Sequence, residues 1–156
     1  MINLIWAMDE NWLIGNDNKM PWRIKEDLLY YKSKTEGKNV LMGYNTYISL
    51  KGYYKDKPLP YGKIYVATRH DRVLDDAIVI NDIDSFLNTF NDELWVLGGA
   101  SIYERALPYA NYLYISFVKG SHVGDAYFPK FDLNDYKLIS KKDSIEVSYQ
   151  VFKRGD

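Results

Sequence analysis

The fold class is indicated most directly by the segment Leu94-Trp95-Val96-Leu97-Gly98-Gly99-Ala100-Ser101-Ile102-Tyr103. It begins with a continuous apolar run, which is typical of a strand that a parallel sheet buries on both faces. Two glycines follow, and a helix is predicted from residue 101 to about residue 107, where Pro108 ends it. A buried strand that leads directly into a helix is typical of the α/β class.

The same alternation of strands and helices is predicted along the rest of the chain. Apolar runs predict strands at residues 2–8, 40–42, 64–68, 77–80 and 113–118, and helices are predicted at residues 24 to about 37, 46–50 and 82–90. Residues 136–140 and 146–152 alternate in polarity and predict an antiparallel hairpin. The sequence therefore predicts one α/β domain over residues 1–156, with a mostly parallel central β-sheet, antiparallel C-terminal strands and flanking helices.

The composition excludes several functional classes. A formal net charge of −1 creates no field that would attract nucleic acid or an anionic membrane. The chain has no cysteine, and its two histidines, His70 and His122, are far apart, so no metal-ligand spacing is present. Residues 1–8 lack the basic region and long apolar run of a signal peptide or membrane span, so a cytoplasmic location is expected.

Asp27 is the most informative single residue. In the predicted helix, Ile24, Leu28 and Tyr31 lie at positions i, i+4 and i+7 and form one apolar stripe, and Asp27 falls inside that stripe. A carboxylate on a face built for burial is destabilising unless another group pairs with it. A capping or structural role is one explanation, and a ligand that offers hydrogen-bond donors in a mostly apolar pocket is the other. The long loop predicted just before the helix, residues 9–23, is of a kind that is often functional.

Three predicted strand ends carry residues that suit a phosphate-type anion. They are Gly98-Gly99, Gly43-Tyr44-Asn45-Thr46 and Thr68-Arg69-His70. Glycines let a ligand approach the backbone closely, and the unpaired N–H groups at a helix start attract phosphate. Each signal alone also fits a tight turn or simple surface charge. Together they favour a ligand site, because open α/β sheets bind ligands at the carboxyl ends of their strands.

Several short motifs occur along the chain in a specific order. They are Ile14-Gly15, Met20-Pro21-Trp22 with Asp27 five residues on, Val40-Leu41-Met42-Gly43 with Thr46, Pro58-Leu59-Pro60, Gly98-Gly99-Ala100 with Tyr103, and Gly124-Asp125-Ala126-Tyr127-Phe128-Pro129. In this order and spacing the chain resembles the dihydrofolate reductase family over essentially its whole length. The resemblance implies a dihydrofolate-reductase-like fold and NADPH-dependent reduction of 7,8-dihydrofolate to 5,6,7,8-tetrahydrofolate, which supports one-carbon metabolism. The alternatives are a same-fold reductase of a pterin or pyrimidine without a glutamate tail, and a non-catalytic folate- or nucleotide-binding protein.

The resemblance also implies roles for individual residues. Asp27 would hydrogen-bond the pterin 2-amino group and N3, would be paired only when substrate is bound, and would favour protonation at N5. Trp22 would help to hold a water molecule near the pterin, Met20 would belong to a mobile loop that closes over the nicotinamide, and Ser116 would place a hydroxyl beside the pterin and the acid. The implied substrate-binding residues are Ile5, Ala7, Asp27, Leu28, Tyr31, Ile48, Leu50, Leu59 and Ser116. The implied NADPH-binding residues are Ala7, Ile14, Gly15, Gly43, Tyr44, Asn45, Thr46, Thr68, Arg69, Leu97, Gly98, Gly99, Ala100, Ser101, Ile102 and Tyr103.

The family pattern carries further expectations and two departures. It implies a cis peptide between Gly98 and Gly99, contact of Asp125 with the loop at residues 9–23, and a monomer that binds dihydrofolate and antifolate-type small molecules. Tyr44 stands where many members carry Arg or Lys. No arginine follows Leu59-Pro60, where the family has one that binds the glutamate α-carboxylate of the substrate. Lys63 and Lys32 are the nearest candidates to replace it.

Overall fold

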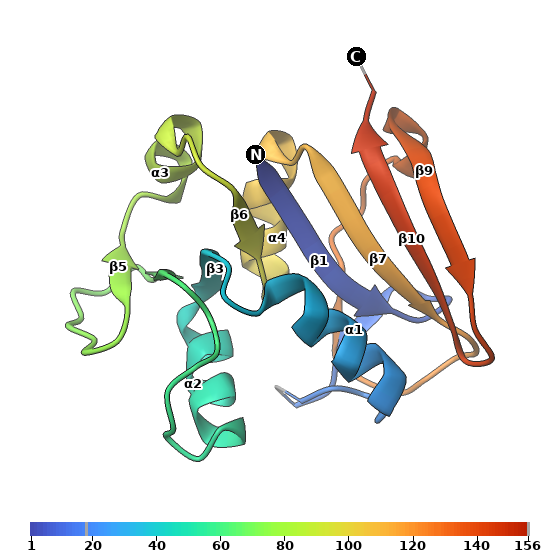
Figure 1. Ribbon diagram of the computed structural model, residues 1–156, viewed down its shortest axis with the longest axis horizontal. Helices are drawn as coiled ribbons and strands as arrows, with labels where there is room; N and C mark the ends of the chain where they lie inside the picture. The colour runs from blue at the N-terminus through green and yellow to red at the C-terminus, as the bar shows by residue number, and fades with distance from the viewer. Residues whose placement is uncertain (18, 156) are drawn as a thin grey trace.

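A computed structural model describes residues 1–17 and 19–155 (Figure 1). Among these residues, eight strands form one sheet in the order β5-β4-β3-β6-β1-β7-β10-β9. In that order the strands are β5 (Ile78–Ile80), β4 (Ile64–Ala67), β3 (Val40–Gly43), β6 (Leu94–Val96), β1 (Ile2–Met8), β7 (Tyr112–Val118), β10 (Val147–Arg154) and β9 (Tyr136–Asp143). Every neighbouring pair from β5 to β7 is parallel, whereas β10 is antiparallel to both β7 and β9.

The sheet buries a separate core on each face. Successive side chains of a strand point to opposite faces, so Leu4 and Trp6 of β1 pack into one core and Ile5 packs into the other. The first core is covered by α3 (Ile83–Thr89) and α4 (Ala100–Ala106), and the second by α1 (Lys25–Thr35) and α2 (Tyr44–Tyr53). Figure 1 shows α1 in front of the sheet and α4 behind it. This two-sided arrangement explains why the central strands read as continuous apolar runs.

Local signals account for the helix boundaries. Asp82 caps α3, because its side chain accepts a hydrogen bond from the backbone N–H of Ser85. The short 3-10 turn η1 (Leu107–Tyr109) follows α4 directly, with Pro108 inside it, and a second one, η2 (Leu133–Asp135), precedes β9. None of the helices in the described part of the chain is long and apolar enough to cross a membrane.

The predicted α/β architecture is confirmed, and two local predictions are corrected. The helix predicted at residues 46–50 begins directly after β3 and is the longer α2, Tyr44–Tyr53. The predicted loop at residues 9–23 contains the short strand β2 (Leu13–Gly15), which pairs antiparallel with β8 (Ala126–Tyr127). This strand carries no periodic signal because it is short and its partner is distant in sequence. Residue 18 of that loop, and residue 156 of the predicted domain, lie outside the described residues.

Candidate active site

The candidate site forms where the parallel strands end. Gly43 at the end of β3 is in register with Ala67 at the end of β4. The backbone N–H of Gly43 also donates to the carbonyl of Gly98, with an N···O distance of 2.8 Å, and that of Leu97 donates to Leu41 at 2.9 Å. The three strand ends that the sequence singled out therefore lie side by side, at the carboxyl ends of the neighbouring strands β4, β3 and β6.

Asp27 lies in the first turn of α1 and is only 7% exposed. Burial raises the pKa of its carboxyl above the ordinary value of 3.8, a hydrogen bond with the Ser116 hydroxyl acts in the opposite direction, and the nearby charge of Glu26 adds to the rise. Ser116 reaches this position from β7, where it is in register with Ala7 of β1. Ser116 is thus a polar neighbour of the carboxyl, and the expectation that Asp27 is paired only when substrate is bound stays a prediction.

The apolar residues predicted around Asp27 divide into buried and exposed groups. Ile5, Trp22 and Leu59 are buried, and Ala7, Tyr31 and Leu50 are partly buried. Leu28 is 38% exposed, Ile48 is 49% exposed and Met20 is 50% exposed. The stripe predicted on α1 is therefore not a core face along its whole length, because Ile24 is buried at the helix start while Leu28 faces solvent. Large exposed apolar side chains close to a buried acid are suited to covering a ring-shaped ligand.

Trp22 contributes a polar group that the protein does not use. Its indole N–H is buried and has no hydrogen-bond acceptor among the described residues. The ring packs edge-on against His122, with the centroids 5.2 Å apart, and lies in the same cluster as Ile24 and Ala7. A buried donor without an acceptor is uncommon in a folded protein and is well placed to bind a water molecule.

The second part of the site is a cradle of glycines. The peptide bond between Gly98 and Gly99 is cis, as predicted, and Gly98 has a φ of +112°. A Cβ atom at Gly98 would lie 3.1 Å from the ring of Tyr103, and one at Gly43 would lie 3.1 Å from Cγ1 of Ile102. The Tyr103 hydroxyl donates to the carbonyl of Ile5 at 2.7 Å, which fixes α4 against β1. Gly43 and Gly98 are buried and leave space for the side chains of Ile102 and Tyr103, whereas Gly99 and Ala100 at the start of α4 are only partly buried.

Further polar groups surround this cradle. The Thr46 hydroxyl lies 3.7 Å from the position that a Cβ of Gly99 would take, so α2 and the glycine pair face each other. Thr68 follows β4, and its Oγ1 accepts a hydrogen bond from the backbone N–H of His70 at 3.2 Å. Arg69, Asn45 and Ser101 are exposed, and the remaining predicted cofactor residues, Ile14, Gly15, Tyr44 and Ala100, are partly buried.

The loop before α1 is tied to the segment before β8. The backbone N–H of Asp17 donates to both carboxylate oxygens of Asp125, at 3.1 and 3.2 Å, so the predicted contact of Asp125 with this loop is confirmed. The loop begins at Asp9, which is 1% exposed. Asp9 accepts backbone N–H bonds from Asn11 and Leu13, both at 2.9 Å, and from His122 at 2.8 Å. Asp9 is therefore a structural acid, in contrast to Asp27.

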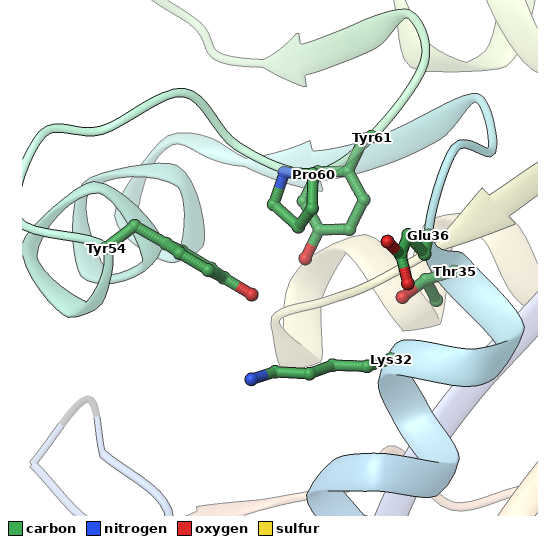
Figure 2. A pocket seen from close by; sticks show the side chains of 6 residues that line it. All are labelled: Lys32, Thr35, Glu36, Tyr54, Pro60 and Tyr61. Carbon is green, nitrogen blue, oxygen red and sulfur yellow. The ribbon is translucent and has the colours of Figure 1, made fainter.

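A cavity of about 170 Å³ lies beside α1, between this helix and the segment that precedes β4. It is lined by Lys32, Thr35, Glu36, Tyr54, Pro60 and Tyr61 (Figure 2). Figure 2 shows the Lys32 side chain extending toward Tyr54, and the Lys32 Nζ lies 6.0 Å from the centroid of that ring. The hydroxyls of Tyr61 and Tyr31 are 3.2 Å apart.

Two charged residues line this cavity, the cation Lys32 and the acid Glu36. Burial raises the pKa of Tyr61 to about 12, against a smaller lowering by its hydrogen bond with Tyr31, so its hydroxyl is a neutral donor at physiological pH. Lys63 is exposed and does not line the cavity. The residue before it, Gly62, packs closely against Gly37, because a Cβ at Gly62 would lie 2.9 Å from the carbonyl oxygen of Gly37. Of the two lysines considered from the sequence, the structure therefore supports only Lys32.

Comparisons with known proteins agree with this geometry. The family model described as "Dihydrofolate reductase" matches residues 1–153. The chain belongs to the dihydrofolate reductase family. The dihydrofolate reductase of Bacillus subtilis (strain 168) is 37% identical over 145 residues, which cover 91% of this chain and 83% of the relative. That of Buchnera aphidicola subsp. Acyrthosiphon pisum (strain APS) is 39% identical over 147 residues, covering 92% of this chain and 89% of the relative.

A solved structure has the same fold. Dihydrofolate reductase from Enterococcus faecalis, complexed with NADP(H) and RAB-propyl, superposes with a TM-score of 0.89 at 23% sequence identity, covering 100% of this chain and 97% of that chain. At this identity the likeness concerns the fold.

Neither the sequence pattern nor the resemblance to the dihydrofolate reductase family predicts three features of the site. Asp9 was not recognised as a buried acid, because an acid at the start of a loop carries no periodic signal. Tyr54 and Tyr61 line the cavity beside Lys32, and the only hint was the position of Tyr61 after Leu59-Pro60. Arg72 stacks on Tyr44, and the spacing of these two residues in the sequence does not predict the contact.

Proposed function

We propose that this protein catalyses the NADPH-dependent reduction of 7,8-dihydrofolate to 5,6,7,8-tetrahydrofolate and so supports one-carbon metabolism. The observation that carries the proposal is the buried carboxyl of Asp27, with a raised pKa, beside Ser116 and at the same sheet edge as the glycine cradle. Membership of the dihydrofolate reductase family gives this arrangement its substrate.

The donor set at the strand ends fits a phosphorylated dinucleotide. Gly99 carries no side chain and faces the Thr46 hydroxyl, and these two residues would hold a pyrophosphate. Arg69 offers a planar fork that suits the 2′-phosphate, with Thr68 beside it. Ala7 packs in the same cluster as Trp22, and Ala7 and Ile14 would contact the nicotinamide. NADPH bound in this cradle would supply the hydride.

Asp27 gives the site its substrate selectivity and its proton chemistry. Its carboxylate accepts hydrogen bonds from an aminopterin, whose 2-amino group and N3 present two donors in one plane. Ser116, whose hydroxyl lowers the pKa of Asp27, would help to orient the carboxyl. The negative charge favours protonation of the pterin at N5. The indole N–H of Trp22, which has no acceptor among the described residues, would hold a water molecule that could carry the proton.

The surrounding residues exclude bulk water from this chemistry. Ile5 and Leu59 form a buried wall, and Leu28, Ile48 and Leu50 cover the rings of the substrate. The loop that carries Met20 closes over the nicotinamide side, and the bonds between Asp17 and Asp125 steady the closed form. Exclusion of water strengthens the interaction between Asp27 and the pterin.

The direct test is oxidation of NADPH with dihydrofolate as the sole added substrate, followed by absorbance. Turnover that requires both compounds supports the proposal. Tight binding of both without turnover would instead indicate a non-catalytic folate- or nucleotide-binding protein, and Asp27→Asn is the matched variant that separates chemistry from binding.

One observation favours a second candidate, a reductase whose substrate has no glutamate tail. The cavity beside α1 is lined by a lysine, a glutamate and two tyrosines but no arginine, so it offers one positive point charge beside an acid and no planar fork for a carboxylate. The ratio of kcat/KM for dihydrofolate to that for a tail-less dihydropterin decides between the two candidates. A ratio near one favours the second candidate.

We further propose that the protein acts as a cytoplasmic monomer that binds dihydrofolate and antifolate-type molecules and does not bind nucleic acid. The balanced charge supports the last point, because it provides no basic surface for phosphate backbones. Light scattering of the purified protein tests the monomer, cell fractionation tests the location, and competition by a diaminopyrimidine antifolate tests the ligand class.

A further inference from the structure

The loop between β4 and β5 is fastened at both ends. At its start, the side-chain amide of Asn81 donates to the carbonyls of Thr68 and His70, at 2.9 and 3.3 Å. At its end, Asp76 accepts hydrogen bonds from the Lys51 ammonium, at 2.8 Å, and from the Tyr47 hydroxyl. Lys51 and Tyr47 belong to α2, so the loop is held against the helix that starts at the glycine cradle.

Arg72 sits in the middle of this loop, and its guanidinium stacks on Tyr44. The guanidinium carbon lies 3.8 Å from the centroid of the Tyr44 ring. Tyr44 is the first residue of α2 and follows Gly43, which is in register with Ala67, while Thr68 and Arg69 come next after Ala67. The stack therefore places a second guanidinium near the carboxyl ends of β3 and β4, and Arg69 follows the end of β4. Stacking engages the flat face of an arginine and leaves its N–H edge available.

The charges around Arg72 leave it available for an anion. Within residues 1–17 and 19–155 the ion pairs are Lys38–Glu93, Lys51–Asp76 and Arg105–Asp84, and neither Arg69 nor Arg72 takes part in one. Asp76, an acid of the same loop, is already held by Lys51 and Tyr47. Asp71 and Asp75 are exposed to solvent and offset part of the local positive charge.

We propose that Arg72, fixed on the Tyr44 ring, binds the 2′-phosphate of NADPH together with Arg69 and is a main determinant of the preference for NADPH over NADH. The Cα atoms of residues 69 and 72 are at most about 11 Å apart, so two arginine side chains can reach one phosphate. Tyr44 acts as a platform that orders Arg72 before the nucleotide binds. The inference rests on the proposed use of NADPH. It also explains how this chain places a cation beside Tyr44, which stands where many family members carry Arg or Lys.

The test compares two probes that differ only in the 2′-phosphate: adenosine 2′,5′-bisphosphate and adenosine 5′-monophosphate. Calorimetric titration of the full chain measures the affinity of each. In Arg72→Gln the bisphosphate should bind about 5- to 30-fold more weakly, the range for one charge-assisted contact at an exposed site. The monophosphate should change by less than about twofold, because it lacks the recognised group. Arg105→Gln is the matched control and should change neither affinity.

The platform is tested separately. Tyr44→Phe keeps the ring on which Arg72 stacks and should weaken the binding of the bisphosphate less than Tyr44→Leu does. Arg72→Gln should cost less affinity in the Tyr44→Leu background than alone, because the two residues act as a unit. Equal weakening of both probes in Arg72→Gln, or no weakening of either, would overturn the proposal.

The outcomes separate this inference from the proposed function. If the unmodified protein reduces dihydrofolate with NADPH and Arg72→Gln keeps full preference for the bisphosphate, only the inference fails. If the unmodified protein shows an Arg72-dependent preference for the bisphosphate but no turnover of dihydrofolate, only the proposed function fails.

Discussion

Two buried acids, Asp9 and Asp27, differ in what surrounds them. Asp9 accepts three backbone N–H bonds, so its charge is satisfied by the protein itself. Asp27 has the Ser116 hydroxyl and a burial that raises its pKa, so its charged form is disfavoured until a ligand brings more donors. Burial alone therefore does not distinguish a structural acid from a functional one, and the number of donors does.

Asp27→Asn should fold and lose most of its activity at pH 7. The asparagine still accepts a bond from Ser116, but it cannot supply the charge that favours protonation of the pterin. We expect kcat/KM for dihydrofolate to fall by about 10²-fold or more. Near-native turnover at pH 7 would show that Asp27 does not have this role.

The same variant has a defined effect on stability. Because the folded pKa of Asp27 lies above 3.8, the folded state holds its proton more tightly than the unfolded state. The stability that protonated Asp27 contributes is therefore fully present below the pKa of the unfolded state, and it is lost as the pH rises through the pKa of the folded state. Asp27→Asn should match the unmodified protein in urea unfolding near pH 3 and exceed it near pH 7. A variant that is less stable at pH 7 would contradict the raised pKa.

Asp9→Asn should behave in the opposite way. The asparagine places an NH₂ group against one of the backbone N–H donors, from His122 or from Asn11 and Leu13. Leaving a buried donor without an acceptor costs about 1–3 kcal/mol. We expect the free energy of unfolding at pH 7, measured in urea, to fall by that amount. An unchanged midpoint would mean that water replaces the lost acceptor.

At the scale of elements, α1 carries both the proposed catalytic acid and a cation of the cavity. Asp27 lies in its first turn and Lys32 in its last, so in the proposed function the helix would span the reacting ring and the tail of a folate. Interactions with the tail should be similar in the ground and transition states. They should therefore change KM more than kcat.

Lys32→Met should raise KM for dihydrofolate by about 2- to 5-fold with little change in kcat, because an exposed ion pair is worth at most about 1 kcal/mol. The KM of a tail-less dihydropterin should not change. Lys63→Met is the matched control, since Lys63 does not line the cavity. An equal rise of KM for both substrates in Lys32→Met would place the lysine outside the tail site.

The elements differ in how far the sequence predicts them. Continuous apolar runs located β1, β6 and β7, and Asp82 located the start of α3, because these signals are local. The pairing of β2 with β8 joins segments more than a hundred residues apart and has no local signal. In the site, the glycine pair and Asp27 were found from their neighbours in sequence. The family resemblance already placed Ser116 beside Asp27, whereas the stack of Arg72 on Tyr44 joins a loop to a helix and only the fold reveals it.

At the scale of the molecule, binding at the sheet edge should stabilise the whole chain. The cradle draws on β3, β4, β6, α2 and α4, so a ligand there binds only the folded state. A concentration 100 times Kd adds about 2.7 kcal/mol. For a domain of this size NADPH should raise Tm by about 5–10 °C in a thermal scan. NADH at the same concentration should give a smaller shift, and equal shifts would mean that the 2′-phosphate is not recognised.

The outer strands of the sheet have a consequence for behaviour at high concentration. β5, at one margin, has only three residues, whereas β9, at the other, has eight and exposes Leu138 and Ile139. Such a margin is a template on which another chain can pair. Lys137, Lys141 and Lys142 lie along β9. If two chains paired at this strand, the lysines of both would be brought close together, and their repulsion opposes the pairing. Colloidal stability should therefore depend on a few ammonium groups far from the active site. A Lys141→Thr, Lys142→Thr variant should keep its turnover and precipitate at lower protein concentration, and more readily in high salt, where static light scattering would record the onset.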